Sequence, residues 1–591
     1  MRLKSPSVLV LLVIFALMGT PMATAQDQDF LSYDPAFRPT PVRIVPEEDL
    51  DKVKAPFVVA RLKNGKLALM ARDATGRMAP FFVKGIETGF WDTRGRGQKT
   101  DWDEVFSNYR KLGANVSLFM LHWKDIEPEE GRFTFDFSDE IVNTARRYGV
   151  RIWWVFFMHD NGQLRRGRDF WVFNYDNRGS ANYAVQWVKD ENGNILDSFD
   201  KIRATQAELL PCYAHPKIFA FQNRVIRQLA RRYRDSNAVI GMQTGNEEGF
   251  IPNVPLNREV DVNPYTLKFY EDWKAKTGKS DWNAFKFNAV AWWWRHFTTS
   301  FHAEDPYKLT SFNLWGAFGE QGRTEVIRSQ GADHTIYALG NLDVIGSMFY
   351  RDEARAVWPN LDAFYLDYIF NLPILLPSEI GIGGEGPHTE IVGGSKVIFQ
   401  EYTINALERG AHGYSAYCYG QMMDDNGRPD AYAEAYRKLT AMVTAVEDIL
   451  HPGVPGPGGV AFSTGAKGAK ISHLNRPDGA TVGILRFPEA AFDNQAPDPS
   501  RVSFVADQNT AKFDLTVEVG ARKEGNYKLE VFRDGELAFS KSATLKAGQN
   551  VQLDLTDVRA TEAVFLKATP RTGRITEPKK GIPRRGRPLS P

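Results

Sequence analysis

Short apolar runs alternate with amphipathic segments through most of this chain. The apolar runs have the character of strands that are buried on both faces of a sheet. They are Phe81–Ile86, Asn115–Leu121, Arg151–Phe157, Val239–Thr244, Leu309–Leu314, Val344–Phe349, Ile374–Pro377 and Gly413–Cys418. The amphipathic segments predict helices, and these are Asp103–Leu112, Ser138–Tyr148, Phe221–Tyr233 and Lys396–Arg409. Ser138 is the expected N-cap of the second helix and Gly149 its stop. Regular alternation of strands and helices predicts a parallel sheet with crossover helices.

Eight strands with intervening helices match an α/β fold of the TIM-barrel type, a (β/α)8 barrel with long loops. A doubly wound open sheet is the alternative, and the absence of a Gly-rich phosphate loop after the first strand weakens it. The loop after strand three, residues 158–215, contains several Trp and Tyr residues. A loop of this length and aromatic content is expected to form a wall of a cleft.

The two ends of the chain differ from the barrel region in composition and in the pattern of apolar positions. Arg2 and Lys4, an apolar run and the sequence Ala23-Thr24-Ala25 resemble a cleaved export signal, so the mature chain is expected to begin at Gln26. An uncleaved N-terminal anchor is the alternative. Beyond Pro452, alternating patterns predict a small antiparallel β domain, most simply a sandwich. The expected organisation is a signal peptide (1–25), a lead-in (26–79), the catalytic barrel (80–450), a C-terminal antiparallel β-sandwich domain (451–570) and a basic disordered tail (571–591).

Composition narrows the class of partner. The chain has 591 residues, of which 43% are hydrophobic and 13% aromatic, and its formal net charge is only +1. So small a net charge provides no global field for nucleic acid or an anionic membrane, and no mature segment is apolar enough to cross one. The aromatic content fits either a large core or a cleft in which sugars stack on rings. Cys212 and Cys418 give only weak grounds for a disulfide, and no Cys-based metal motif is present.

Carboxylates stand at two strand ends, where the active sites of TIM barrels lie. Strand four ends in Gln243-Thr244-Gly245-Asn246-Glu247-Glu248-Gly249, and strand seven ends in Pro377-Ser378-Glu379-Ile380-Gly381. Two carboxyl groups that face each other across a barrel mouth are what glycosidic bond cleavage requires. Glu248 adjoins Glu247, and neighbouring strand residues point to opposite faces, so only one of them can face a sugar.

These motifs resemble clan A of the glycoside hydrolases. The stretch from Trp123 to Gly131, with Ile126-Glu127-Pro128 inside it, is followed by Phe133-Thr134-Phe135-Asp136-Phe137 and is similar to the turn after strand two in β-galactosidases of families 42 and 35. The order Gln243-x-x-Asn246-Glu247-x-Gly249 also fits their strand four. The resemblance covers residues 81–419. It implies that Glu247 is the acid/base, that Glu379 is the nucleophile and that Asn246 holds the sugar 2-hydroxyl.

Further substrate contacts are expected at other strand ends. His122 and Trp123 end strand two and His159 ends strand three. The resemblance implies an aromatic near the nucleophile at Tyr350, where a Tyr bonded only to backbone is the alternative, and an aromatic platform under the sugar at Tyr419. Glu87, at the end of strand one, is expected either to bind a sugar hydroxyl or to pair with a loop Arg. The three consecutive residues from Trp292 are expected to serve packing.

The resulting expectation is a secreted or periplasmic retaining β-glycosidase that needs no cofactor and no metal. By resemblance it is β-galactosidase-like, with plant or algal oligosaccharide or polysaccharide as its carbohydrate substrate. An endo-acting glucanase, agarase or mannanase is the alternative within the class. A non-catalytic carbohydrate-binding protein and a metal-dependent hydrolase are the alternatives outside it. The sequence leaves the oligomeric state open.

Overall fold

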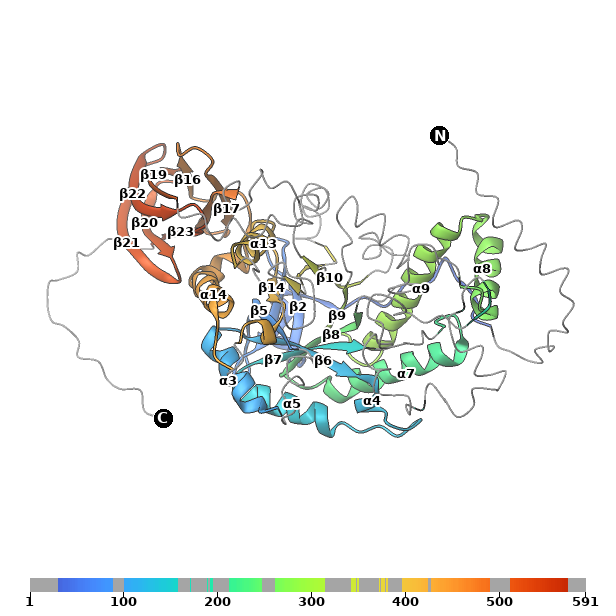
Figure 1. Ribbon diagram of the computed structural model, residues 1–591. Helices are drawn as coiled ribbons and strands as arrows, with labels where there is room; N and C mark the ends of the chain where they lie inside the picture. The colour runs from blue at the N-terminus through green and yellow to red at the C-terminus, as the bar shows by residue number, and fades with distance from the viewer. Residues whose placement is uncertain are drawn as a thin grey trace, which may run out of the picture.

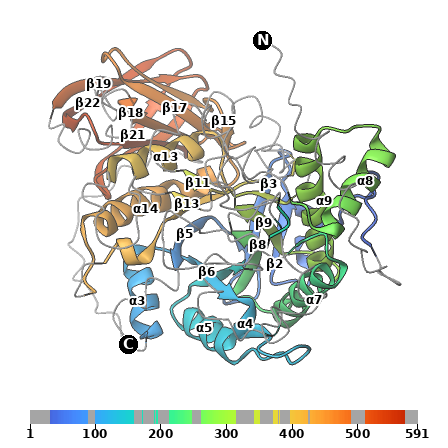
Figure 2. The same cartoon turned by 45° about the vertical axis from the view of Figure 1, so that its right-hand side comes forward.

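The computed structural model of the chain describes residues 30–88, 100–157, 171, 189, 192–194, 212–246, 261–313, 342–346, 348–349, 371–372, 374–377, 379–380, 396–423, 427–488 and 511–571. Within this part of the chain, a parallel sheet ringed by helices is flanked by a small sheet at the N-terminal side and by antiparallel sheets at the C-terminal side (Figures 1 and 2). No helix among these residues is long and apolar enough to span a membrane.

The parallel sheet closes on itself. Its strands are β5 (Val83–Thr88), β6 (Val116–His122), β7 (Arg151–Phe157), β8 (Val239–Asn246), β9 (Leu309–Asn313), β10 (Val344–Ile345), β11 (Met348–Phe349), β12 (Ile374–Leu375), β13 (Glu379–Ile380) and β14 (Gly413–Ala416). Strand β10 pairs with β9 and β12, while β11 pairs with β13, β13 with β14, and β14 with β5. The sixth and seventh strands are thus each broken in two. The predicted barrel is confirmed as a TIM-like barrel, since an open doubly wound sheet does not pair its last strand with its first.

Alternate residues along the barrel strands belong to two different hydrophobic clusters. Leu118 and Met120 lie in an inner cluster with Trp153 and Val344. Their neighbour Phe119 lies instead in an outer cluster with residues of the surrounding helices. Strands buried on both faces therefore account for the nearly continuous apolar runs in the sequence.

Helices surround the ring of strands (Figure 2). They are α3 (Trp102–Leu112), α4 (Trp123–Ile126), α5 (Asp136–Arg147), α7 (Pro216–Tyr233), α8 (Pro264–Thr277), α9 (Trp282–His302), α13 (Lys396–Glu408) and α14 (Ala431–Leu450). The prediction of Ser138 as an N-cap is wrong: α5 begins two residues earlier, after Phe135. The Ser138 hydroxyl bonds to the Phe135 carbonyl and accepts a bond of 2.6 Å from the Tyr233 hydroxyl, so a tertiary contact engages it. The three Trp residues from Trp292 are buried in α9, as expected.

A four-stranded sheet that the sequence pattern did not predict lies in the lead-in. It consists of β1 (Ile44–Pro46), β2 (Phe57–Arg61), β3 (Leu67–Arg72) and β4 (Met78–Pro80). Side chains of β2 and β3, such as Phe57 and Leu69, belong to the inner cluster of the barrel. The lead-in therefore contributes to the interior core.

A buried ion pair fixes the segment before β1. His302 and Asp343 are joined at 3.1 Å, and both side chains are fully buried. The two ring nitrogens of His302 face the carbonyls of Thr40 and Lys308, while Asp343 accepts from the backbone N–H groups of Val42 and Thr310. Burial opposes the charged imidazolium, but attraction to Asp343 outweighs it and raises the pKa of His302.

The C-terminal part consists of two antiparallel sheets. One has the order β15-β17-β18-β23-β20-β21 and the other β16-β19-β22. Their strands are β15 (Val454–Pro455), β16 (Val460–Thr464), β17 (Lys470–Asn475), β18 (Thr481–Arg486), β19 (Lys512–Ala521), β20 (Gly525–Arg533), β21 (Glu536–Leu545), β22 (Asn550–Arg559) and β23 (Val564–Pro570). Val517 of the smaller sheet and Leu529 of the larger share one buried cluster. The antiparallel prediction is confirmed, and the sandwich arrangement of the two sheets stays a prediction.

Arg486 of β18 joins this part to the barrel. Its guanidinium lies between Glu401 and Glu408 of α13, and all three side chains are 5% exposed or less. It bonds to Glu408 at 2.9 Å and also donates to Asn405. Burial would raise the pKa of Glu408, but the adjacent guanidinium lowers it below the ordinary value. One buried cation therefore lies between two buried acids at the junction, and the half-exposed Lys470 of β17 forms a further ion pair with Glu408 at 3.4 Å.

Candidate active site

Two predicted contact residues stand on the inner face of the barrel at neighbouring strand ends. Lys84 of β5 pairs outward with α14, and Ile86 belongs to the outer cluster, so Glu87 alternates to the inner face. His122 lies two residues beyond Met120 of the inner cluster and is the last residue of β6. Glu87 is 1% exposed and His122 is 7% exposed. The structure thus brings a buried carboxylate and a buried imidazole to adjacent carboxyl ends of the barrel.

The turn after β6 is organised by a glutamate that sequence reasoning did not select as a site residue. Glu127 is completely buried. One carboxylate oxygen accepts a bond of 2.9 Å from the indole Nε1 of Trp123, and the other accepts one of 2.7 Å from the backbone N–H of Gly131. Arg224 of α7 forms an ion pair with the same carboxylate. The sequence signal was present, since an acid within Ile126-Glu127-Pro128 follows a Trp by one helical turn.

The same turn fastens one residue of the long loop after strand three. The indole of Trp171 donates to the Glu127 carbonyl at 2.8 Å and packs edge-on against Trp123. The Arg224 guanidinium lies 5.7 Å from the centre of the Trp171 ring and 4.8 Å from that of Phe221. Trp123 is 2% exposed, and its indole N–H is bonded to Glu127. Its role as a sugar contact stays a prediction.

Tyr419 follows β14 in a short 3-10 helix, η4 (Tyr419–Gln421). It is 8% exposed, and its ring stacks on Tyr109 of α3 with centroids 5.9 Å apart. The Asn108 amide donates to its hydroxyl at 3.0 Å. The ring is therefore held from the α3 side, and its role as a sugar platform stays a prediction.

The predicted catalytic pair is described only in part. Strand β8 ends at Asn246, which is in register with Asn313 of β9, and β13 begins at Glu379, which is in register with Met348. The register of β8 shifts between Gln243 and Asn246, where Gly245 has φ +127°, a backbone conformation that a Cβ atom disfavours. For Asn246 and Glu379 only the backbone is described, and Glu247, His159 and Tyr350 lie outside the described residues.

Neither a cluster of metal-ligating side chains nor a disulfide is present in the part of the chain that the structure describes. There, no group of three or more His, Cys, Asp or Glu side chains is placed to hold a metal ion. Cys212 and Cys418 are both buried free thiols, so they do not form the disulfide that export would permit. Burial raises the pKa of the Cys212 thiol far above its ordinary value, which keeps it protonated and unreactive.

Comparison with known proteins points to one group of enzymes. The sequence model of glycoside hydrolase family 42, described as β-galactosidase, matches residues 95–156, which contain the turn around Glu127. This chain resembles family 42 β-galactosidases. β-Galactosidase BbgII of Bifidobacterium bifidum is 23% identical over 207 residues, which are 34% of this chain and 26% of that protein. β-Galactosidase BglY of Alicyclobacillus acidocaldarius is 31% identical over 145 residues, which are 24% of this chain and 18% of that protein.

The regions of these two curated relatives that align with this chain are thus about a quarter or less of each relative's own length. A solved structure titled "Glycoside hydrolase" aligns with a TM-score of 0.46 and 11% identity, covering 87% of this chain and 97% of the other. The resemblance to clan A and family 42 that the motifs predicted is confirmed by the family match and the curated relatives.

Proposed function

We propose that this protein is an exported, retaining β-glycosidase that acts on β-galactosides. The observation that carries the proposal is the match of residues 95–156 to the β-galactosidase family, with curated β-galactosidases as relatives. Glu127 and two of its partners, Trp123 and Gly131, lie inside the matched segment. The substrate is a neutral carbohydrate, in keeping with a formal net charge of +1.

The proposed chemistry is a double displacement between two glutamates. Strand β8 occupies the fourth position of the barrel and ends next to Glu247, and β13 occupies the seventh and begins at Glu379. Glu379 attacks the anomeric carbon while Glu247 protonates the leaving oxygen, and Glu247 then takes the proton from the water that releases the sugar. This requires carboxyl groups ~5–5.5 Å apart.

The inner-face residues suit a supporting role. Glu87 and His122 lie at the ends of the first two strands and have the donors and acceptors that sugar hydroxyls need. Asn246 adjoins the proposed acid/base and is assigned to the 2-hydroxyl, a contact that strengthens in the transition state. Residues 1–25 are assigned to an export signal, and sequencing the N-terminus of protein recovered outside the cytoplasm should give Gln26.

The test compares matched glutamates. Glu247→Gln and Glu379→Gln should lose about a thousandfold in kcat/KM on a β-linked galactobiose, whose sugar leaving group must be protonated, while the adjacent Glu248→Gln should retain activity. The order of anomers released should show the β-anomer first, as in retention. Aryl β-glucosides and β-mannosides, and a β-galactan with its product sizes measured, cover the endo-acting alternative. Full activity of either Gln variant, or release of the α-anomer first, would refute the assignment.

A further inference from the structure

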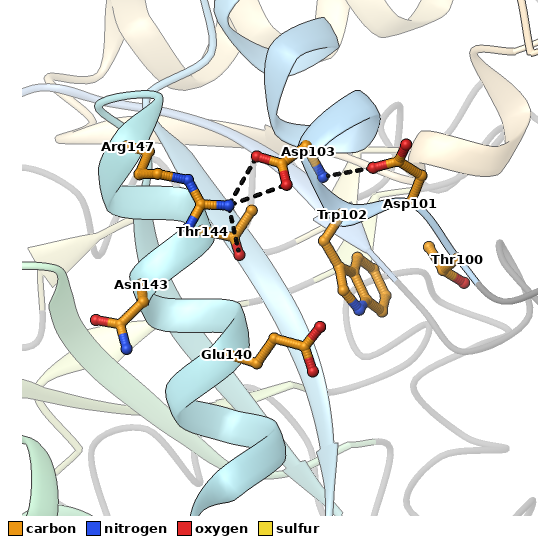
Figure 3. A pocket seen from close by; sticks show the side chains of 8 residues that line it. All are labelled: Thr100, Asp101, Trp102, Asp103, Glu140, Asn143, Thr144 and Arg147. Carbon is orange, nitrogen blue, oxygen red and sulfur yellow. Dashed lines mark hydrogen bonds and ion pairs between the residues drawn. The ribbon is translucent and has the colours of Figure 1, made fainter.

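A groove of about 460 Å³ lies on the outside of the barrel, between α3 and α5 (Figure 3). The groove is lined by the first turn of α3 and by the part of α5 from Glu140 to Arg147. Its volume is within the range of about 300–1,000 Å³ that small-molecule sites occupy. The side chains that matter for its chemistry are those of Trp102, Asp103, Glu140, Asn143, Thr144 and Arg147.

Trp102 supplies a fixed aromatic surface. Its ring packs edge-on against Phe119 of β6, with centroids 5.1 Å apart, and against Phe137 of α5, with centroids 6.3 Å apart. The indole is nevertheless only partly buried and lines the groove. A ring that the core already holds in place loses little conformational entropy when a ligand stacks on it.

Polar groups stand on both sides of that ring. Asp103 and Arg147, whose side chains are both more than half exposed, are paired at 2.7 Å, and the Tyr148 hydroxyl also donates to Asp103. The Arg147 hydrogen bond holds the pKa of Asp103 below its ordinary value, so its carboxylate stays ionised. Glu140 and Asn143 lie one turn apart on α5 and are exposed. The Asn143 amide oxygen accepts a bond of 2.9 Å from Arg146, and Figure 3 draws no bond from either residue to the other lining residues.

The chemistry of the lining favours one class of ligand. The three lining carboxylates, those of Asp101, Asp103 and Glu140, outnumber the single guanidinium and disfavour an anion, and the polar rim disfavours a purely apolar molecule. Among the residues that the structure describes, these acids are not arranged as a metal-binding group. A neutral pyranose fits this lining, because its C–H face stacks on an indole while its vicinal hydroxyls form hydrogen bonds with planar carboxylates and amides.

We propose that this groove is an accessory carbohydrate-binding site that holds a neutral pyranose unit on the indole of Trp102. The inference rests on the proposed function in one respect, because a second sugar site outside the barrel mouth would retain a polymeric substrate near the site of cleavage. The groove itself needs neither Glu247 nor Glu379. Its sugar binding can therefore be measured separately from hydrolysis.

Affinity electrophoresis in gels that contain soluble β-1,4-galactan, xylan or mixed-linkage β-glucan tests the groove with the full chain. The protein should be retarded in at least one gel, and Trp102→Leu should raise the apparent Kd about tenfold, the effect of losing one to two good contacts. The double variant Glu140→Gln/Asn143→Ala changes only exposed side chains and should weaken retention without affecting folding. Glu104→Gln, an exposed residue of the same helix that does not line the groove, is the matched control.

Each outcome decides between the two proposals. Retention that depends on Trp102 in a protein that hydrolyses no β-galactoside would support the groove and overturn the proposed function. Equal retention of the wild type and both groove variants, or no retention in any gel, would overturn the groove whatever the hydrolysis shows. Retention that disappears at high salt would mean that charge holds the ligand, which contradicts a neutral sugar. Hydrolysis of a short aryl β-galactoside should be the same in Trp102→Leu as in the wild type.

Discussion

Replacing Glu127 by Gln should destabilise the barrel by about 2–3 kcal/mol. The carboxylate accepts three hydrogen bonds in a site without solvent access, from Trp123, Gly131 and Arg224. A Gln amide retains one acceptor oxygen and turns an NH2 group toward one of those donors. One charge-assisted bond is then lost, at about 1.5–3 kcal/mol, and one donor is left unpaired, at about 1–3 kcal/mol. Arg224 is 34% exposed and can be hydrated, which keeps the sum near the lower end.

The assay is urea unfolding followed by tryptophan fluorescence, with an exposed glutamate of the same turn as control. Glu129 pairs with Arg132 at 2.7 Å, but both side chains are more than 60% exposed. Glu129→Gln should therefore change the free energy of unfolding by less than about 0.5 kcal/mol. A double-mutant cycle of Glu127→Gln with Arg224→Gln should give a coupling of about 0.5–3 kcal/mol. If the two glutamate variants unfold at the same urea concentration with the same slope, the buried network does not stabilise the turn.

Three further predictions follow from buried groups. The pKa of His302 is raised in the fold, so its ion pair stabilises the folded state fully below the unfolded pKa of about 6.5, and this stabilisation is lost as pH rises through the higher folded pKa. His302→Gln should abolish that part of the dependence of stability on pH. A variant whose stability has the same dependence between neutral and alkaline pH as the wild type would contradict the reasoning. Arg486→Met removes the buried cation between Glu401 and Glu408 and leaves only the half-exposed Lys470 beside Glu408. The variant should lose about 3–5 kcal/mol of stability and be cleaved earlier by protease between the barrel and the C-terminal sheets, and adding Glu401→Leu and Glu408→Leu should restore resistance. Gly413→Ala places a Cβ 2.3 Å from the Val83 carbonyl oxygen and should prevent β14 from pairing with β5. Gly149→Ala adds a Cβ with no atom beyond its chain neighbours within 4 Å, so it carries only the cost of its φ of +73°. Equal thermal stability of the two variants would refute the reasoning.

The barrel could be predicted because its signal is local. Arg151–Phe157 is an uninterrupted apolar run, and the predicted strand and β7 have the same bounds. The lead-in sheet carried a comparable signal, since β2 and β3 are apolar runs joined at Asn64-Gly65, a dipeptide typical of tight hairpin turns. The hairpin was not predicted, because the polar, Pro-containing sequence before it indicated a linker. The breaks in strands six and seven were not predicted, because Val344–Phe349 and Ile374–Pro377 each form one largely apolar run in the sequence.

The candidate site was predictable to a different extent at each residue. Glu87 and His122 could be placed by counting along strands, because alternation fixes the face of each position. The role of Glu127 could not be derived in the same way, because Arg224 comes from a helix almost a hundred positions further on. A pattern read along the chain contains the acid but not the partner that defines what the acid does.

The pairing of β14 with β5 also determines when the barrel can form during synthesis. Val83 pairs with Gly413, so the first strand has no partner on one side until nearly the whole barrel has been made. Until then β5 presents an unpaired edge, to which another chain can add a strand. Long-range closure of this kind is slow, because a large loop must be ordered before its contacts form. Expression that outpaces closure should therefore yield aggregates held together through β5, and slower synthesis or a chaperone that covers this edge should raise the soluble yield.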